Sequence, residues 1–423
     1  MGVITGIFLC FIAGKLPFCG GTSTNPPPAF AVPPSKGLDL VNLLIGNGGD
    51  TPNGSGGTIP STAPPFGMTR WVAQTQPHYV SATPFNWTLN KVMGVVGTRQ
   101  PAIWMGESAP ISVSAGVGPG VVVDFEKRGL EVTRGPDGEK SEVVSAGYYS
   151  VELDDGHGGS IKLEQTASAY GIPCLYSLLI YPLASRVAHL RFTFKTPLSP
   201  RILFEVARPS VLTSTPTNIS FPLGGISIKT PLEICGWSDE RQDSIIAPIS
   251  TTPFSKHFKG YFCGRFDESL PHPSYGVIQN ETLSYPVPLP AVAQGPLLST
   301  YALFPAKEGG ETIITLRVGT SFISEEQARK NIDNEIPDPS STFTESAHVQ
   351  DKHLISGTFE NTAYRVRKSW ADILNRVRLD VYADGRTEAS DTRAHIDEQT
   401  FWTAVVHTLQ VGWLVGSARI SDD

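Results

Sequence analysis

A ten-residue stretch from Thr98 to Glu107, TRQPAIWMGE, combines an aromatic side chain with several hydrogen-bonding ones. Trp104 offers an aromatic face on which a sugar ring can stack. Arg99, Gln100 and Glu107 offer hydrogen bonds to sugar hydroxyl groups. Because tryptophan lies in a core more often than at a ligand, the sequence leaves both positions open for Trp104. Three other tryptophans are assigned to the core: Trp71, Trp237 and Trp370.

The second candidate is a glycine-rich stretch that begins at Asp39, DLVNLLIGNGGDTPNGSGGTIPSTAPPFGMTRW. An apolar, strand-like run over Val41–Ile45 breaks into glycines, and the chain becomes apolar again at Pro65–Met68. Glycine tolerates positive φ and lets backbone N–H groups approach a ligand, and binding groups tend to sit on loops of a rigid scaffold. Asn47 and Asp50 are the polar side chains that we assign to such a site. A long surface loop between two strands is the alternative.

Paired carboxylates are the groups that hydrolyse glycosidic bonds, but the acidic pairs here have simpler interpretations. Asp154–Asp155 reads as a surface turn, Glu325–Glu326 as a helix start and Asp422–Asp423 as a tail. His157 reads as a turn residue and His407 as a helix position. The five cysteines have no metal-ligand spacing. We therefore assign no catalytic residue and no metal ligand.

The composition favours a β-rich protein of two or three domains. The chain has 423 residues, 40% hydrophobic and only 17% charged, with 41 glycines and 35 prolines. That glycine and proline content indicates many turns and short strands. The formal net charge of −7, without a basic patch, argues against a nucleic-acid partner.

The N-terminus indicates secretion. Residues 1–21 form a candidate signal segment, because the apolar run Met1–Gly14 resembles a signal h-region and is too short to span a bilayer. Residues 22–38 form a Pro-rich linker, expected to be extended. No later segment reaches transmembrane length. Cys235 and Cys263 are consistent with a disulfide or with two buried thiols. Four N-glycosylation sequons would be usable in a secreted chain: Asn53, Asn86, Asn218 and Asn280.

Residues 39–320 carry the signals of a β-sandwich, namely short apolar runs punctuated by Gly, Pro, Asn and Asp. Ser150–Asp154 and His189–Phe194 alternate as half-buried strands should. Many strands without intervening helices favour two packed sheets. The expected strands include Val121–Phe125, Tyr148–Leu153, Val187–Phe194, Ile202–Val206, Ile226–Ile228 and Thr312–Val318.

Helical patterns take over after the sandwich, in a linker region over residues 321–360. Ser324 and Gln327 form a capping box for a helix that runs to about Glu335 and stops before Pro337. Further helices are expected over Asn361–Arg378 and Thr392–Leu409. Their apolar faces hold Val366, Trp370, Ile373, Leu374 and Val377, and then Phe401, Trp402, Val405, Val406 and Leu409.

The pattern LVNLLIGNGGD followed by APPFGM resembles the opening of the family 92 glycoside hydrolases, which are calcium-dependent α-mannosidases. The resemblance covers Asp39 to Gln410. It is strongest at Asn42–Asp50, Ala63–Met68, Ser145–Leu153, Phe322–Pro337 and Phe401–Gln410. It implies a β-sandwich joined through linker helices to an (α/α)6 barrel, with the active site at their interface. It also implies inverting hydrolysis by a carboxylic acid and a carboxylate base, helped by a calcium ion that takes oxygen ligands.

Two segments depart from the family pattern. The pattern of Leu163–Ser168 leads in the family almost directly into a strand like Arg186–Phe192, whereas here the apolar segment Ala169–Ser185 intervenes. We interpret that segment as translated intron sequence, and an extra buried strand or short helix is the alternative. Residues 361–410 resemble the first barrel helices, and residues 411–423 are a tail without a family counterpart.

The sequence thus predicts a mainly β chain, a large sandwich followed by linker helices and the start of a truncated barrel. The resemblance implies a secreted, fungal-type α-mannosidase acting on mannose-containing glycans. The catalytic acid, the base and the calcium ligands are expected in the missing barrel, on which the sandwich would pack. We expect the chain alone to be inactive. The alternatives are a non-catalytic carbohydrate-binding sandwich and a structural subunit that depends on a partner.

Overall fold

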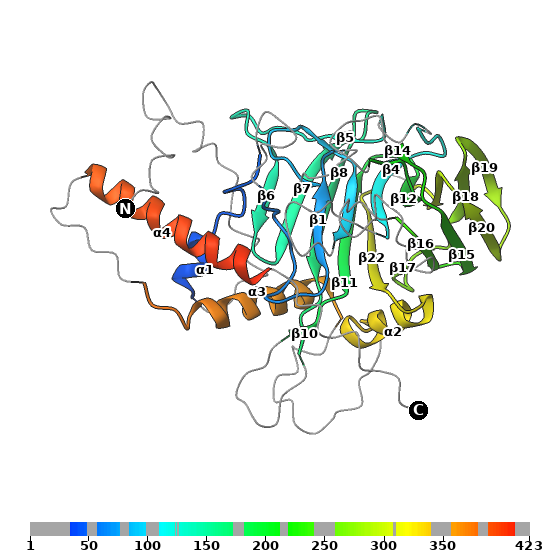
Figure 1. Cartoon of the computed structure of the whole chain (residues 1–423). Helices are drawn as coiled ribbons and strands as arrows, with labels where there is room; N and C mark the ends of the chain where they lie inside the picture. Colours follow the sequence, from blue (N-terminus) through cyan, green and yellow to red (C-terminus); the bar gives the residue numbers. More distant parts are fainter. Residues whose placement is uncertain are drawn as a thin grey trace, which may run out of the picture.

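Two large antiparallel sheets form the body of the protein, and helices lie along one side of it (Figure 1). The computed structural model describes residues 34–48, 57–76, 84–98, 110–122, 124, 127–171, 182–211, 219–240, 259–307, 310–339, 357–379 and 388–410. The predicted mainly β fold is confirmed. None of the helices among these residues is long and apolar enough to cross a membrane.

The strand order defines each sheet. The seven-stranded sheet runs β1 (Arg70–Gln74), β3 (Gly94–Thr98), β4 (Ser112–Val117), β12 (Pro200–Ala207), β21 (Leu298–Leu303), β18 (Ser274–Gln279) and β19 (Thr282–Val287). The nine-stranded sheet runs β20 (Ala291–Gly295), β15 (Gly224–Thr230), β16 (Glu233–Ser238), β17 (Gly260–Phe266), β22 (Thr312–Ser321), β11 (Val187–Lys195), β8 (Ser160–Ala167), β7 (Tyr148–Asp154) and β6 (Glu142–Ser145). Three short pairs complete the strands: β2 (Lys91–Val92) with β5 (Leu130–Glu131), β9 (Tyr170–Gly171) with β10 (Pro182–Ala184), and β13 (Ser210–Val211) with β14 (Ile219–Ser220).

The core lies between the two sheets. Phe204 of the seven-stranded sheet meets Phe266 of the nine-stranded sheet edge to face, with ring centroids 6.1 Å apart. Trp71 and Trp370 are fully buried, as predicted. The core assignment of Trp237 is wrong, because its ring is partly exposed and Lys259 Nζ lies 3.4 Å from the ring centroid.

Most expected strands are confirmed, and three local predictions are wrong. The run Val41–Ile45 forms a turn, held by bonds from Ile45 N to Asn42 O and from Asn47 N to Leu44 O. Val121 and Val122 are not in a strand, and two of the three residues after them lie outside the described residues. The linker prediction fails at its end, because helix α1 (Lys36–Leu40) begins there with Ser35 as its N-cap.

The helices begin and end close to their predicted bounds. Helix α2 (Glu325–Glu335) is capped by Ser324, whose hydroxyl accepts a bond from Gln327 N at 3.0 Å. Helix α3 (Phe359–Leu374) starts two residues before the predicted helix and ends four residues before its end, so Val377 lies beyond it. Helix α4 (Glu388–Leu409) starts four residues before its predicted start.

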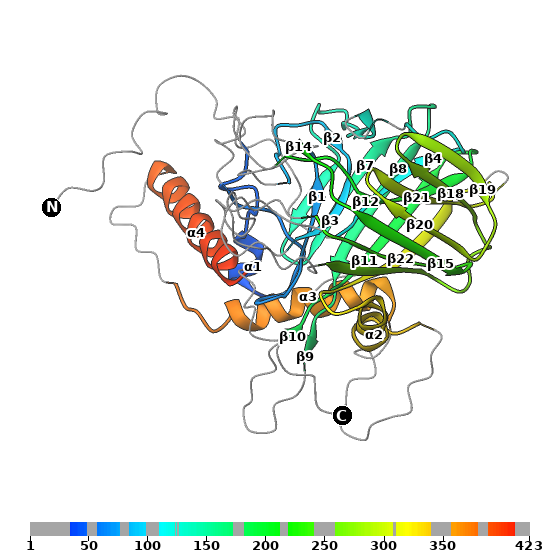
Figure 2. The ribbon, with the colours of Figure 1, turned by 45° about the vertical axis from the view of Figure 1, so that its right-hand side comes forward.

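Helix α3 covers the outer face of the nine-stranded sheet near β7, β8 and β11 (Figure 2). Tyr148 of β7 packs with Phe359 and Ala363 of α3. His189 of β11 bonds through Nδ1 to Thr362 Oγ1 at 3.0 Å. The alternating pattern predicted half-buried strands here. Glu152 and Arg191 are only partly buried, as expected, but His189 is buried because α3 replaces solvent beside it.

The inserted segment begins and ends in short strands. β9 and β10 pair antiparallel, with Gly171 opposite Pro182 and Tyr170 opposite Ala184. Residues 172–181 between them lie outside the described residues. The intron hypothesis remains a prediction.

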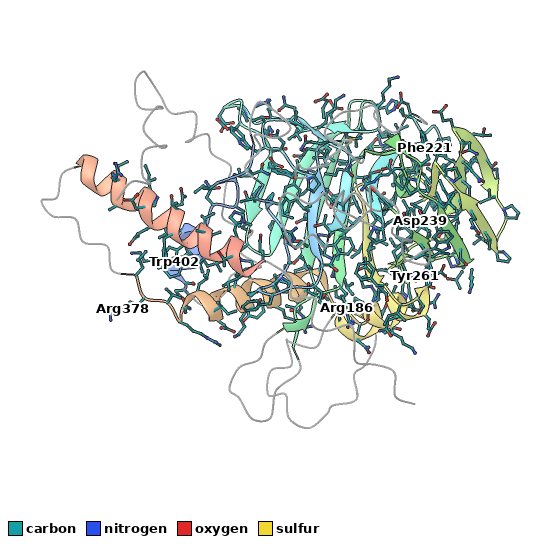
Figure 3. The ribbon with its side chains drawn as sticks, viewed as in Figure 1. Arg186, Phe221, Asp239, Tyr261, Arg378 and Trp402 are labelled. Atoms are coloured by element: carbon teal, nitrogen blue, oxygen red, sulfur yellow. A yellow bond between two sulfur atoms is a disulfide. The ribbon has the colours of Figure 1, made fainter. Side chains whose placement is uncertain are left out.

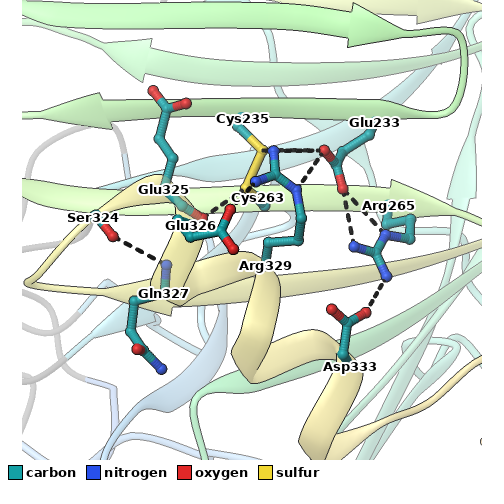
Figure 4. Close-up of a disulfide and its surroundings, with 10 residues drawn as sticks. All are labelled: Glu233, Cys235, Cys263, Arg265, Ser324, Glu325, Glu326, Gln327, Arg329 and Asp333. Atoms are coloured by element: carbon teal, nitrogen blue, oxygen red, sulfur yellow. Dashed lines mark hydrogen bonds and ion pairs between the residues drawn. A yellow bond between two sulfur atoms is a disulfide. The ribbon is translucent and has the colours of Figure 1, made fainter. Parts of the chain in front are cut away.

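A disulfide joins Cys235 of β16 to Cys263 of β17, directly opposite in the sheet register, under helix α2 (Figure 4). Beside it, Glu233 accepts bonds from Arg329 Nε at 2.9 Å and from Arg265 Nε at 3.1 Å. Arg265 also pairs with Asp333 of α2. The charge network attaches α2 to the sheet, and Ala328 and Ile332 of α2 pack on the disulfide that joins the two strands.

The Glu233 network makes stability depend on pH. Burial opposes ionisation of Glu233, but the hydrogen bonds and charges of Arg329 and Arg265 outweigh it and hold the carboxyl pKa below its ordinary value. A lowered folded-state pKa stabilises the fold above the unfolded pKa, and this contribution is lost as pH falls through the folded pKa. We expect Glu233→Gln to cost about 1–3 kcal/mol near neutral pH. Urea unfolding of both proteins should show this difference shrinking as pH falls below about 4.5, and a difference independent of pH would contradict the assignment.

Candidate functional site

Asn47 orders the start of the glycine-rich loop. Its side chain is 5% exposed. Asn47 Nδ2 donates to Thr58 O at 2.9 Å and to Phe85 O at 2.7 Å, and Asn47 Oδ1 accepts from Trp87 N at 3.1 Å. All three partners are backbone groups, so this amide ties the two ends of the loop together and to the segment before β2. Its predicted sugar contact remains a prediction.

Trp87, which sequence reasoning missed, packs on the same loop. Gly48 has φ +92°, and a Cβ built there would lie 2.0 Å from Trp87 Nε1. Only glycine fits this close approach. The half-buried indole of Trp87 is therefore an aromatic surface beside the loop. The other five predicted sugar-binding residues lie outside the described residues: Asp50, Arg99, Gln100, Trp104 and Glu107.

A buried polar cluster lies at the ends of β1, β12 and β16. Arg208 Nε and Glu240 Oε2 are 3.2 Å apart, with side chains 3% and 1% exposed. Arg208 Nη1 donates to Gln74 Oε1 at 2.8 Å, and Ser112 Oγ donates to the same oxygen at 3.3 Å. Segments 212–218 and 241–258 begin close after Arg208 and Glu240. The cluster holds the strand ends from which those segments leave.

Sequence spacing gave no sign of this cluster, because its members come from four distant segments. The available signal was a charged residue, Arg208, directly after the mainly apolar strand run Ile202–Ala207. A charge at such a point needs a partner if it is buried.

The segment that contains APPFGM joins the sandwich to the helices. Trp370 Nε1 of α3 donates to Ala63 O at 3.0 Å. Phe66 N donates to Leu409 O at 2.7 Å, and Gln410 Nε2 donates to Ser61 O at 3.2 Å. The residues that carry the family resemblance thus contact α3 and the end of α4.

Helices α1 and α4 also pack together (Figure 3). Trp402 is 3% exposed, and a Cβ built at Gly37 would lie 2.8 Å from its ring. Lys36 Nζ pairs with Glu398 Oε1 at 2.6 Å. Helix α4 is therefore fixed to the N-terminal segment on one face, while Ile396 and Phe401 remain 48% and 37% exposed.

His189, Asp155 and Glu325 have structural roles. Burial, with the charges of Arg317 and Arg191, lowers the pKa of His189 well below its ordinary value, so this histidine is neutral between the sheet and α3. Asp155 accepts bonds from His157 N and Gly159 N and closes a turn, as the sequence predicted for this pair. Glu325 starts α2.

No group of three or more His, Cys, Asp or Glu side chains in the described parts of the chain could hold a metal ion. The described side chains therefore include no carboxylate cluster for the calcium ion that the resemblance implies.

Comparison with known proteins identifies the fold. An inverting mannosidase of family GH92 from Bacteroides thetaiotaomicron superposes with a TM-score of 0.60 at 20% identity, over 90% of this chain and 40% of that one. A family GH92 α-mannosidase from the same organism superposes with a TM-score of 0.58 at 18% identity, over 87% and 40% of the two chains. A further GH92 glycosyl hydrolase gives a TM-score of 0.56 at 17% identity, over 87% and 40%.

At these identities the likeness concerns the fold, and the chain spans about 40% of the length of the solved structures. A search of curated proteins found no match. The model of the glycosyl hydrolase family 92 N-terminal domain matches residues 40–321. Because this match covers more than half of the sequence, the chain belongs to glycosyl hydrolase family 92.

Proposed function

We propose that this chain is the N-terminal part of an inverting, calcium-dependent α-mannosidase that acts on α-linked mannose of glycoproteins or mannan. The observation that carries the proposal is the family match over residues 40–321. The superposition on the inverting mannosidase, which extends over 90% of this chain, supports it.

The sandwich supplies sugar contacts in this proposal. The first loop, which Asn47 orders through its bonds to backbone groups, presents Asp50. The loop that begins after Thr98 presents Arg99, Gln100, Trp104 and Glu107. Trp104 stacks on the face of a mannose ring, while the polar groups bond its hydroxyls. No acid, base or calcium ligand is assigned to this chain. A calcium ion held by oxygen ligands would supply positive charge that holds and distorts the sugar.

A further helical domain packs against α3 and α4 in this proposal. The exposed side chains of Ile396 and Phe401 support it, because apolar side chains on one helix favour helical neighbours. Turnover requires groups from that domain. The pure chain is therefore inactive.

The protein acts outside the cell or in the secretory pathway. The Cys235–Cys263 disulfide supports this location, because disulfides persist in oxidising compartments.

Titration calorimetry and sugar-release assays test the proposal on the purified chain. We expect methyl α-mannoside to bind more tightly than methyl α-galactoside, with no mannose released from mannan in the presence of calcium. Loss of an aromatic stacking contact of about 0.5–1.5 kcal/mol predicts that Trp104→Ala weakens binding about 2- to 12-fold. Trp237→Ala is the matched control, because that ring already pairs with Lys259.

Equal affinity for the two sugars, or an equal effect of the two tryptophan variants, would contradict the proposed sugar site. Steady release of mannose by the pure chain would contradict the need for a further domain.

A further inference from the structure

Two of the four N-glycosylation sequons lie in the described residues, and their surroundings differ. Asn86 begins the sequon Asn86-Trp87-Thr88, and Asn280 begins Asn280-Glu281-Thr282. The sequence gives no reason to prefer either sequon as a glycan acceptor. Their burial and their hydrogen bonds distinguish them.

The acceptor residue of the Asn86 sequon is buried in the folded protein. Asn86 is 6% exposed, and its Oδ1 accepts bonds from Thr88 N at 3.0 Å and Thr88 Oγ1 at 2.8 Å. Its backbone N–H donates to Thr75 Oγ1 at 2.8 Å. A bulky, hydrated glycan has no room at a side chain packed in this way. The folded protein therefore excludes a glycan from Asn86.

The Asn280 sequon forms the tip of the β18–β19 hairpin. Gln279 pairs with Thr282, so Asn280 and Glu281 are the two loop residues, with φ of 47° and 62°. Positive φ at both positions is typical of a type I′ turn, in which asparagine is favoured. Asn280, Glu281 and Thr282 are all exposed. Asn280 N donates to Leu297 O at 3.2 Å, which holds the turn against the neighbouring loop.

The position of the hairpin also suits a glycan. In Figures 1 and 2, β19 lies at the end of the sandwich opposite α4. A glycan there leaves α3 and α4 free for contacts. β19 is the edge strand of its sheet, and Leu283 and Tyr285 on it are 38% and 40% exposed. Edge strands with exposed apolar residues invite pairing with other chains, and a hydrophilic glycan at the turn shields this edge.

We propose that Asn280 carries an N-linked glycan and that Asn86 does not. In the transfer, Asn280 Nδ2 forms a bond to the anomeric carbon of a lipid-linked oligosaccharide diphosphate. The bond from that carbon to the diphosphate oxygen breaks, the lipid diphosphate leaves with the electron pair, and Nδ2 loses one proton. Native glycosylation rests on the proposed secretory location.

The test supplies secretory entry, so that it is independent of the chain's own routing. The full chain is fused to a cleavable secretory leader and translated with microsomes. Leader-cleaved chains are then treated with peptide N-glycosidase in ¹⁸O-water, and the sequon peptides are weighed. We expect the Asn280 peptide to carry the label, Asn280→Gln and Thr282→Ala to lose one glycan's mass, and the control Glu281→Gln to keep it.

An unlabelled Asn280 peptide in leader-cleaved chains would overturn the first half of the proposal. Label at Asn86 in soluble, protease-resistant chains would overturn the second half, whereas label confined to aggregated chains agrees with it. Glycosylation at Asn280 together with failure of the native N-terminus to direct secretion would leave the acceptor site intact and contradict only the proposed location.

Discussion

Replacing Glu240 with alanine is expected to lower the free energy of unfolding by about 3–5 kcal/mol, because the change leaves the buried Arg208 charge without its carboxylate. The two side chains are 1% and 3% exposed, so solvent cannot take over the lost contact. Arg208→Ala is expected to have an effect of similar size. Guanidinium chloride unfolding, followed by circular dichroism, measures both changes.

The double variant Arg208→Met with Glu240→Leu tests whether the unpaired buried charge is the cause of the lost stability. Replacing both charges with apolar groups is expected to cost far less than either single change, because no unpaired charge remains. Asp372→Ala is the matched control, since the Lys368–Asp372 pair is exposed and is expected to contribute under about 1 kcal/mol. If the double variant lost as much as the sum of the single variants, the buried pair would not be the cause.

Trp370→Ala is expected to cost about 3–5 kcal/mol, because the change opens a cavity where a fully buried indole stood. The variant also leaves Ala63 O without its 3.0 Å bond from Trp370 Nε1. Trp370→Phe keeps most of the volume and is expected to lose mainly that bond, about 1–2 kcal/mol. Phe401→Ala, at a side chain 37% exposed, is the control and is expected to change stability by less than about 1 kcal/mol.

The same experiment tests whether the helices and the sandwich unfold together. Far-ultraviolet circular dichroism at the helical band reports mainly the helices, and near-ultraviolet circular dichroism reports aromatic packing, most of it in the sandwich. Because Trp370 bridges α3 and the segment before β1, we expect both signals to shift together in Trp370→Ala. A shift of the helical signal alone would contradict the packing of α3 on the sandwich.

The fold was largely predictable because most strands show an apolar or alternating pattern in their own sequence. Runs such as Val187–Phe194 alternate, and the capping box at Ser324 marks a helix start. Local patterns do not show which strand faces are covered by segments that are distant in the sequence. His189 stands at a polar position of an alternating run, and only the chain beyond Phe359 makes that face a second interface. Val41–Ile45 is apolar because Leu43 is fully buried in a turn, which a pattern of apolar residues alone cannot distinguish from a strand.

The candidate site was predictable in part. Glycines around Asn47 indicated a special loop, and Gly48 meets that expectation at its contact with Trp87. The three backbone bonds of the Asn47 amide come from segments that no spacing connects. The Arg208–Glu240 pair could not be predicted from the sequence for the same reason. Contacts between distant segments depend on the finished sheet register, which composition and periodicity do not encode.

Sequencing the mature transcript past the codon for Gln410 tests most directly whether this chain is the N-terminal part of a mannosidase. We expect the message to continue in frame through further amphipathic helices, with acidic residues able to serve as acid and base. A mature message that ends after the codon for Asp423 would contradict it. Sugar binding without hydrolysis would then be the remaining function of this sandwich.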